Sequence, residues 1–350
     1  MHCTFARLDH SDACVMMFLG IHTARFFSHL QVPDFSLFGV YDGHGGDTVA
    51  HYAAKHFMRF LLDTKQLTAT MPESEVQQRA KVAFEQALMA IDKEMASLPE
   101  IESGHDQSGS TSVMTLIGPK HIVCANTGDS RAVLARAGQA VALSHDHKPF
   151  NAGEKERIEN AGSHVQFNRV NGDLAVSRAL GDFVYKRCDS MSAELQAVTA
   201  FPEIICETRC PADEFIVLAC DGIWDVMSSQ EVVDKVHDML ANGRPPPPPS
   251  EEGGGEESAT AEPRPPVSTR QWDLGAVSEC LIDHCLRLGS RDNMSVIVLI
   301  LNPKFMPKPE PAATGGSAAA SAAGGAAARE GGGASAGAAA SSTAGGKLPV

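Results

Sequence analysis

Basic residues are scarce in this chain, and their scarcity argues against one class of function. Lysine and arginine together number 29 against 43 aspartate and glutamate residues, which gives a formal net charge of −14 at pH 7. Nucleic-acid-binding proteins normally carry a basic stripe or patch, so we expect no nucleic-acid partner. The acidic balance suits a chain that gathers carboxylates around hard cations, although an acidic surface that keeps the protein soluble explains it equally well.

Long hydrophobic runs are also missing. The one membrane-like stretch, residues 14–21, is too short to span a bilayer. Asp9 and Asp12 precede it in place of the basic leader of a secretory signal, whereas Arg7 and Arg25 leave an organelle transit peptide open. We therefore expect no membrane partner.

No CxxC pair occurs among the nine cysteines, and the closest pairs lack the histidine or cysteine partners that a zinc site requires. Several cysteines lie inside apolar runs, which favours buried, reduced thiols. Reduced thiols are typical of the cytosol and nucleus, so we expect a cytoplasmic and/or nuclear protein. We also expect a monomer.

Two segments have compositions that cannot build a core. Residues 243–270 contain five consecutive prolines and an acidic, glycine-rich block, and residues 303–350 are rich in alanine, glycine, serine and proline. We expect both to be disordered, because neither can bury enough apolar surface to offset the entropy of ordering it. Residues 35–302, without that insertion, provide the core-forming sequence of one domain, and residues 1–34 form a separate N-terminal segment.

Hydrophobic periodicity predicts a mixed fold. Apolar, β-rich runs predict strands at residues 35–41, 112–117, 121–125, 131–136, 215–220 and 294–301. Amphipathic spacing predicts helices at residues 48–62, 75–95, 154–161, 231–240 and 274–288. Strands grouped in the middle, with helices towards each end, indicate an α+β domain in which helices cover sheets.

Three apolar strands each carry an aspartate at one end: Asp42, Asp221 and Asp292. Taken singly, each aspartate is typical of a turn, but Asp129 and Asp225 also lie at turns beside apolar strands. Carboxylates packed together raise one another's pKa unless cations neutralise them. Oxygen ligands suit Mg²⁺ or Mn²⁺, and two such ions about 3.5–4 Å apart can clamp a displacement at phosphorus. The pattern thus favours a two-metal site.

Seven segments of the chain, several of which contain these aspartates, form one pattern. They are FGVYDGHGG (38–46), SGSTSV (108–113), ANTGDSRAV (125–133), DHKPFNAGEKERIENAGSHV (146–165), NGDLAVSRALGD (171–182), LACDGIWDVMS (218–228) and RDNMSVIV (291–298). In this order they resemble the metal-dependent protein phosphatases of type 2C. The resemblance implies a four-layer α-β-β-α sandwich with two central, mostly antiparallel sheets. It also implies a serine/threonine phosphatase that hydrolyses phosphoserine and phosphothreonine in proteins by in-line attack of a metal-activated water.

The resemblance further implies two Mg²⁺ or Mn²⁺ ions and their ligands. Asp42 would bridge both ions, the Gly43 carbonyl would bind the second, and Asp221 and Asp292 would complete the first. Positions that hold a weaker third ion in some relatives correspond to Asp129 and Asp225. His44 matches the general acid that protonates the leaving serine or threonine oxygen, a role that suits imidazole. On its own, His44 would be interpreted as an exposed loop histidine. Residues 172–182 resemble the segment that leads to the family's flap, which helps to select the substrate, and Arg178 within this segment is expected to pair with a carboxylate.

The N-terminal segment departs from the family pattern. Relatives carry Arg-x-x-x-Glu-Asp-Ala-His upstream, and its arginine clamps the substrate phosphate. Here Arg7 aligns with that arginine, but Ser11 replaces the glutamate and Cys14 the histidine, and Arg25 is a competing candidate. The segment is therefore either divergent or incomplete. Two alternatives to an active protein phosphatase stay open: a pseudophosphatase that binds phosphoproteins or serves a regulatory role, and a hydrolase of small phosphates.

Overall fold

The computed structural model describes residues 4–7, 14–18, 23–27, 34–242 and 274–302. For the three N-terminal pieces the structure describes the backbone alone. The predicted disordered insertion, residues 243–270, and the predicted tail, residues 303–350, lie outside the described residues. No helix in the described part of the chain is both long and apolar enough to cross a membrane.

Two antiparallel sheets form the centre of the fold. The first has the order β14-β8-β7-β4-β3, with bounds Glu203–Thr208, His121–Thr127, Ser112–Ile117, Ser36–Tyr41 and Thr23–Phe27. The second has the order β1-β2-β16-β15-β9-β10, with bounds Thr4–Arg7, Cys14–Phe18, Val296–Ile300, Asp213–Ala219, Arg131–Arg136 and Gln139–Ala142. β2 and β3 thus pair with β16 and β4.

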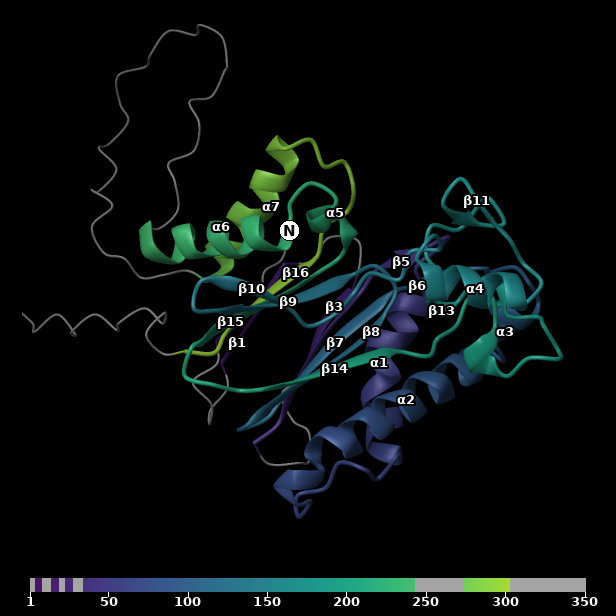
Figure 1. Ribbon diagram of the computed structural model, residues 1–350, viewed down its shortest axis with the longest axis horizontal. Helices are drawn as coiled ribbons and strands as arrows, with labels where there is room; N and C mark the ends of the chain where they lie inside the picture. The colour runs from purple at the N-terminus through teal and green to yellow at the C-terminus, as the bar shows by residue number, and fades with distance from the viewer. Residues whose placement is uncertain (1–3, 8–13, 19–22, 28–33, 243–273, 303–350) are drawn as a thin grey trace, which may run out of the picture. The chain divides into compact units, whose positions relative to one another are not determined.

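Helices cover the outer face of each sheet (Figure 1). On the first sheet lie α1 (Thr48–Asp63) and α2 (Val76–Met95). On the second lie α6 (Ser229–Asn242) and α7 (Leu274–Arg287). Alternation along each strand builds this arrangement, since successive side chains point to opposite faces. In β4, Leu37 packs towards the helices while Phe38 packs between the sheets.

Shorter elements connect these layers. They are β5 (Gly43–His44), α3 (Pro99–Glu102), β6 (Gly109–Ser110), α4 (Ala152–Asn160), β11 (Val165–Gln166), β12 (Arg169–Val170), β13 (Leu180–Gly181) and α5 (Asp221–Trp224). Single 3-10 turns occur at Glu73–Glu75, Phe183–Tyr185 and Ala193–Leu195. β5, β6 and β13 form a small sheet of order β13-β6-β5.

The predicted four-layer α-β-β-α sandwich is confirmed. Every pairing between the named strands is antiparallel. The structure adds β10 and β14, which the periodicity did not predict, and Asp221 begins the short helix α5 rather than a hairpin turn. The expectation of reduced thiols is met at Cys124, Cys220, Cys280 and Cys285, which are free and buried.

Candidate metal centre

Asp42 lies directly after β4, at the end of the first central sheet. Its carbonyl oxygen accepts the N–H of Thr111 at 2.9 Å, which fixes the turn into β5. Steric constraints explain the glycines that follow Asp42. A Cβ on Gly43 would lie 3.1 Å from the Ala50 Cβ, and Gly46 has a φ of +142° that disfavours any other residue. The chain thereby turns back sharply and enters α1 beside the aspartate.

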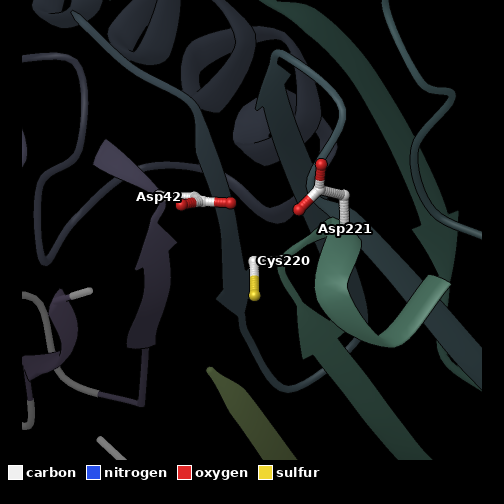
Figure 2. Close-up of side chains that lie close together, drawn as sticks. All are labelled: Asp42, Cys220 and Asp221. Atoms are coloured by element: carbon white, nitrogen blue, oxygen red, sulfur yellow. The ribbon is translucent and has the colours of Figure 1, made fainter. Parts of the chain in front are cut away.

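Asp221 lies directly after β15, at the end of the second sheet, and begins α5. Asp42, Cys220 and Asp221 each place one potential ligand atom within 4.8 Å of the others. Figure 2 shows the carboxylates of Asp42 and Asp221 facing each other across a gap, whereas the sulfur of Cys220 points away from them. Each central sheet therefore places one carboxylate at this site: Asp42 from the first sheet and Asp221 from the second.

Cys220 holds the adjacent backbone instead of offering a ligand. Its sulfur accepts the N–H of Ser295 at 3.2 Å and lies 3.4 Å from the carbonyl oxygen of Asn293, to which the thiol donates. Burial, together with the charge of Asp42, raises the pKa of this thiol well above its ordinary value. Because thiolate is the form that binds metals, Cys220 is a poor ligand. It ties the end of β15 to the turn that enters β16.

Asp292 lies in that same turn. A Cβ on Gly222 would lie 2.7 Å from the Asn293 carbonyl oxygen and 3.2 Å from the Asp292 Cβ, so only glycine allows α5 to approach this closely. The Asp292 carboxylate accepts the N–H of Asn293 at 2.7 Å. With Asp225 and Arg291, among others, it lines a cleft of about 420 Å³. Asp292 lies outside the 4.8 Å group, and its role as a ligand stays a prediction.

The two aspartates predicted for a third ion differ in their surroundings. Asp129 is buried, and Lys148 Nζ donates to its carboxylate at 2.6 Å. Burial raises the pKa of Asp129, and the charge of Lys148 only partly opposes it. Asp225 is exposed at the end of α5, one turn after Asp221. An ammonium group thus already pairs with Asp129, and the third-ion role of both residues remains a prediction.

Electrostatics show that the carboxylates act as a group. Burial is the main cause that raises the pKa of Asp221 to about 8, followed by the charges of Asp129, Asp42, Asp225 and Asp292. A cation beside Asp221 would offset these negative charges and favour its ionised form. The available donors are carboxylate and carbonyl oxygens, which fit Mg²⁺ or Mn²⁺ better than a thiolate-seeking metal.

This raised pKa predicts how pH changes the stability of the metal-free protein. The folded state keeps a proton that an unfolded aspartate releases near pH 3.9, so the free energy of unfolding should fall between about pH 4 and pH 8. Asp221→Asn should remove this loss. In EDTA at pH 8 we expect the variant to melt at least about 3 °C above the wild type, with a smaller difference at pH 5.

Thermal unfolding at both pH values, with EDTA and with Mn²⁺, measures the effect. Other titrating groups act alike in both proteins, so the difference between them isolates the carboxylate group. Saturating Mn²⁺ should stabilise the wild type more than the variant. Equal pH dependence of the two proteins in EDTA would show that the pKa of Asp221 is not raised in the folded protein.

His44 lies in β5, and its Nε2 is 2.6 Å from the buried carboxylate of Asp182. Burial alone would lower the pKa of His44, but the hydrogen bond and charge of Asp182 outweigh it, with smaller contributions from Asp42 and Asp129, and raise that pKa. The imidazole therefore holds a proton more readily than an isolated histidine. Sequence reasoning assigned no role to Asp182 or Lys148, although both lie in segments that carried the family resemblance.

Two arginines, Arg178 and Arg7, also had predicted roles. Arg178 pairs with Glu154 at 2.6 Å, so its predicted structural role is confirmed. Arg7 ends β1, where its backbone pairs with Cys14. The side chain of Arg7 lies outside what the structure describes, and its phosphate-clamping role stays a prediction.

A solved structure shares the fold of this chain. A structure titled serine-threonine phosphatase 2C from Toxoplasma gondii superposes with a TM-score of 0.64, covering 85% of this chain and 98% of that one at 20% identity. At this identity the match establishes the sandwich fold alone.

The sequence matches identify the family. The model of the family described as protein phosphatase 2C matches residues 10–294. Protein phosphatase 1B of Homo sapiens is 40% identical over 282 residues, 79% of this chain and 53% of that protein. A probable protein phosphatase 2C of Caenorhabditis elegans is 46% identical over 238 residues, 68% of this chain and 62% of that protein. The chain belongs to the protein phosphatase 2C family, and it spans about half to two thirds of the length of these relatives.

Proposed function

We propose that this chain is a metal-dependent protein serine/threonine phosphatase, which hydrolyses phosphoserine and phosphothreonine side chains of proteins. One observation carries the proposal: Asp42 and Asp221, from the ends of two different sheets, face each other with their ligand atoms within 4.8 Å. Partly buried carboxylates this close together repel each other unless a cation lies between them, which supports a site built for cations. Family membership supports the reaction.

The residues present divide the work between metal binding and proton transfer. Asp42, the Gly43 carbonyl, Asp221 and Asp292 would hold two Mg²⁺ or Mn²⁺ ions. Such ions supply a water nucleophile at neutral pH and offset the charge of the phosphate. His44, whose pKa is raised by Asp182, would give its proton to the serine or threonine oxygen as the P–O bond breaks.

Hydrolysis of a phosphothreonine peptide tests the proposal. We expect phosphate release with Mn²⁺ or Mg²⁺ and none with excess EDTA, restored when Mn²⁺ is added back. A phosphotyrosine peptide of the same sequence tests the side-chain class, and p-nitrophenyl phosphate tests small phosphates. Folded, Mn²⁺-binding protein that releases no phosphate from any of them would contradict the proposal and favour the pseudophosphatase alternative. Turnover of the small ester alone would favour the small-phosphate alternative.

A further inference from the structure

The small sheet β13-β6-β5 brings His44 and Asp182 together although 138 residues separate them. His44 pairs with Gly109 on one side of the middle strand, and Gly181 pairs with Gly109 on the other. Gly109 has no side chain, so the side chains from the flanking strands meet over it. A Cβ on Gly109 would overlap both the Asp182 carboxylate and the His44 Nε2. The histidine–aspartate contact therefore depends on glycine at this position.

The position of Asp182 is unfavourable in two ways: its carboxylate is buried, and its backbone is left-handed. Its side chain is 5% exposed, and burying a carboxylate costs free energy unless it is paired. Its backbone adopts the left-handed conformation, with φ 52° and ψ 37°, which costs about 1 kcal/mol or more for a residue other than glycine. Within the described part of the chain, His44 is the one hydrogen-bond partner of this carboxylate. Residues with such unfavourable conformations cluster at functional sites.

The backbone around Asp182 is held from several directions. The N–H of Asp182 donates to the Ser108 carbonyl at 3.1 Å, and the N–H of Gly181 donates to the buried Asp92 carboxylate at 2.8 Å. Lys186 Nζ joins the same Asp92 carboxylate, at 2.8 Å, to the Ala179 carbonyl, at 2.9 Å. Helix α2, which carries Asp92, thereby fixes the segment that carries Asp182.

We propose that Asp182 is the positioning residue of His44: it accepts the Nε2 proton in a hydrogen bond, fixes the rotation of the ring, and leaves Nδ1 to protonate the leaving group. This inference rests on the proposed phosphatase function. As the P–O bond breaks, the serine or threonine oxygen keeps both electrons and takes the Nδ1 proton. Water supplies the new oxygen on phosphorus, and the proton that it releases returns to the imidazole through solvent.

Asp182→Asn is the sharpest test, because asparagine has the same shape and tolerates the left-handed backbone. Turnover of a phosphothreonine peptide with Mn²⁺ should fall by roughly tenfold to a hundredfold, since a positioned general acid contributes about 10²–10⁴-fold. Turnover of p-nitrophenyl phosphate should change little, because nitrophenolate leaves without a proton. KM for both substrates and the affinity for Mn²⁺, measured by calorimetry, should stay close to the wild-type values.

A glycine pair provides the matched control. Gly109→Ala should produce the same selective loss on the phosphopeptide, because its methyl group separates His44 from Asp182. Gly153→Ala, where a Cβ would meet no atom within 4 Å, should leave both activities unchanged. NMR of metal-free protein adds a readout that needs no turnover. An exchange-protected, downfield imidazole N–H resonance should be present in the wild type, absent from His44→Gln, and shifted upfield in Asp182→Asn, whose neutral amide oxygen is a weaker acceptor.

The outcomes separate this inference from the proposed function. Equal losses on the two substrates in Asp182→Asn, or loss of Mn²⁺ affinity, would overturn the positioning role and assign Asp182 to the metal centre or to folding. A resonance whose position is unchanged in Asp182→Asn would overturn the contact itself. A wild-type protein inactive on both substrates would overturn the proposed function, and with it the catalytic part of this inference. The resonance would then still decide whether the contact forms.

Discussion

Asp221→Asn should abolish phosphatase activity, with a loss on the order of a thousandfold or more in the turnover of a phosphothreonine peptide. The reason is that Asp221 is one of the two carboxylates that face each other in the candidate metal centre. An asparagine keeps the shape but loses the charge that binds a divalent cation. Removing even one preorganised charge-stabilising group from an active site costs about 10²–10³ in turnover, and a lost metal ligand removes the nucleophile as well.

The measurement is phosphate release at several Mn²⁺ concentrations, alongside calorimetric Mn²⁺ binding. Asp234→Asn is the matched control, because Asp234 is exposed on α6 and its carboxylate accepts a hydrogen bond from Gln230 at 2.8 Å. We expect the control to retain wild-type activity and Mn²⁺ affinity. Activity of Asp221→Asn within about tenfold of the wild type, at Mn²⁺ concentrations that saturate the wild type, would rule out Asp221 as an essential ligand.

Glu154→Gln should destabilise the folded protein by about 3–5 kcal/mol, the range expected when one partner of a buried ion pair is removed. Glu154 in α4 is buried and accepts hydrogen bonds from Arg178 at 2.6 Å, Arg157 at 2.8 Å and Ser177 at 2.6 Å. Burial alone would raise its pKa, but the hydrogen bond from Arg178 and the charges of both arginines outweigh that and lower the pKa to about 2. The variant leaves two guanidinium groups without their counter-charge.

Urea unfolding of Glu154→Gln measures this loss, and Glu159→Gln on the same helix is the control. Glu159 is exposed and lies 3.7 Å from Lys155, so its substitution should cost no more than about 0.5 kcal/mol. The direction in which pH changes the stabilising contribution of Glu154 also follows from its pKa. Because the folded pKa lies below the unfolded one, the contribution of Glu154 is complete above pH 4.5 and is lost as the pH falls towards 2. Similar midpoints for both variants at pH 7 would show that the arginines find other partners.

This ion-pair network also matters for the proposed chemistry. Ser177 and Arg178 lie just before β13, and Arg178 also donates to the Phe201 carbonyl at 3.1 Å. Glu154 therefore anchors the segment that leads to Asp182, opposite the attachment of the same segment to α2 through Asp92. A partial fall in activity of Glu154→Gln under conditions where it remains folded would be consistent with loosening of Asp182.

How well the sequence predicted each element depended on how locally that element is encoded. Helices α1 and α2 were predicted to within one residue at each end, because an apolar stripe at helical spacing is visible in the chain itself. Strand β14 was missed because most of its residues are only partly buried, which weakens the apolar signal. Strand β10 has only four residues, none of them fully buried. Such strands are defined by their pairing partners, β8 and β9.

By itself, the sequence determined most of the central strands and long helices, the aspartates at the strand ends and the family. These follow from periodicity and from short motifs, which are properties of adjacent residues. Only the tertiary structure decided which charges meet. Lys148 is hydrogen-bonded to Asp129, 19 positions away in the sequence, and Asp182 is hydrogen-bonded to His44, 138 positions away. No local pattern encodes such contacts, because they depend on how the strands pair and on which glycine leaves room between them.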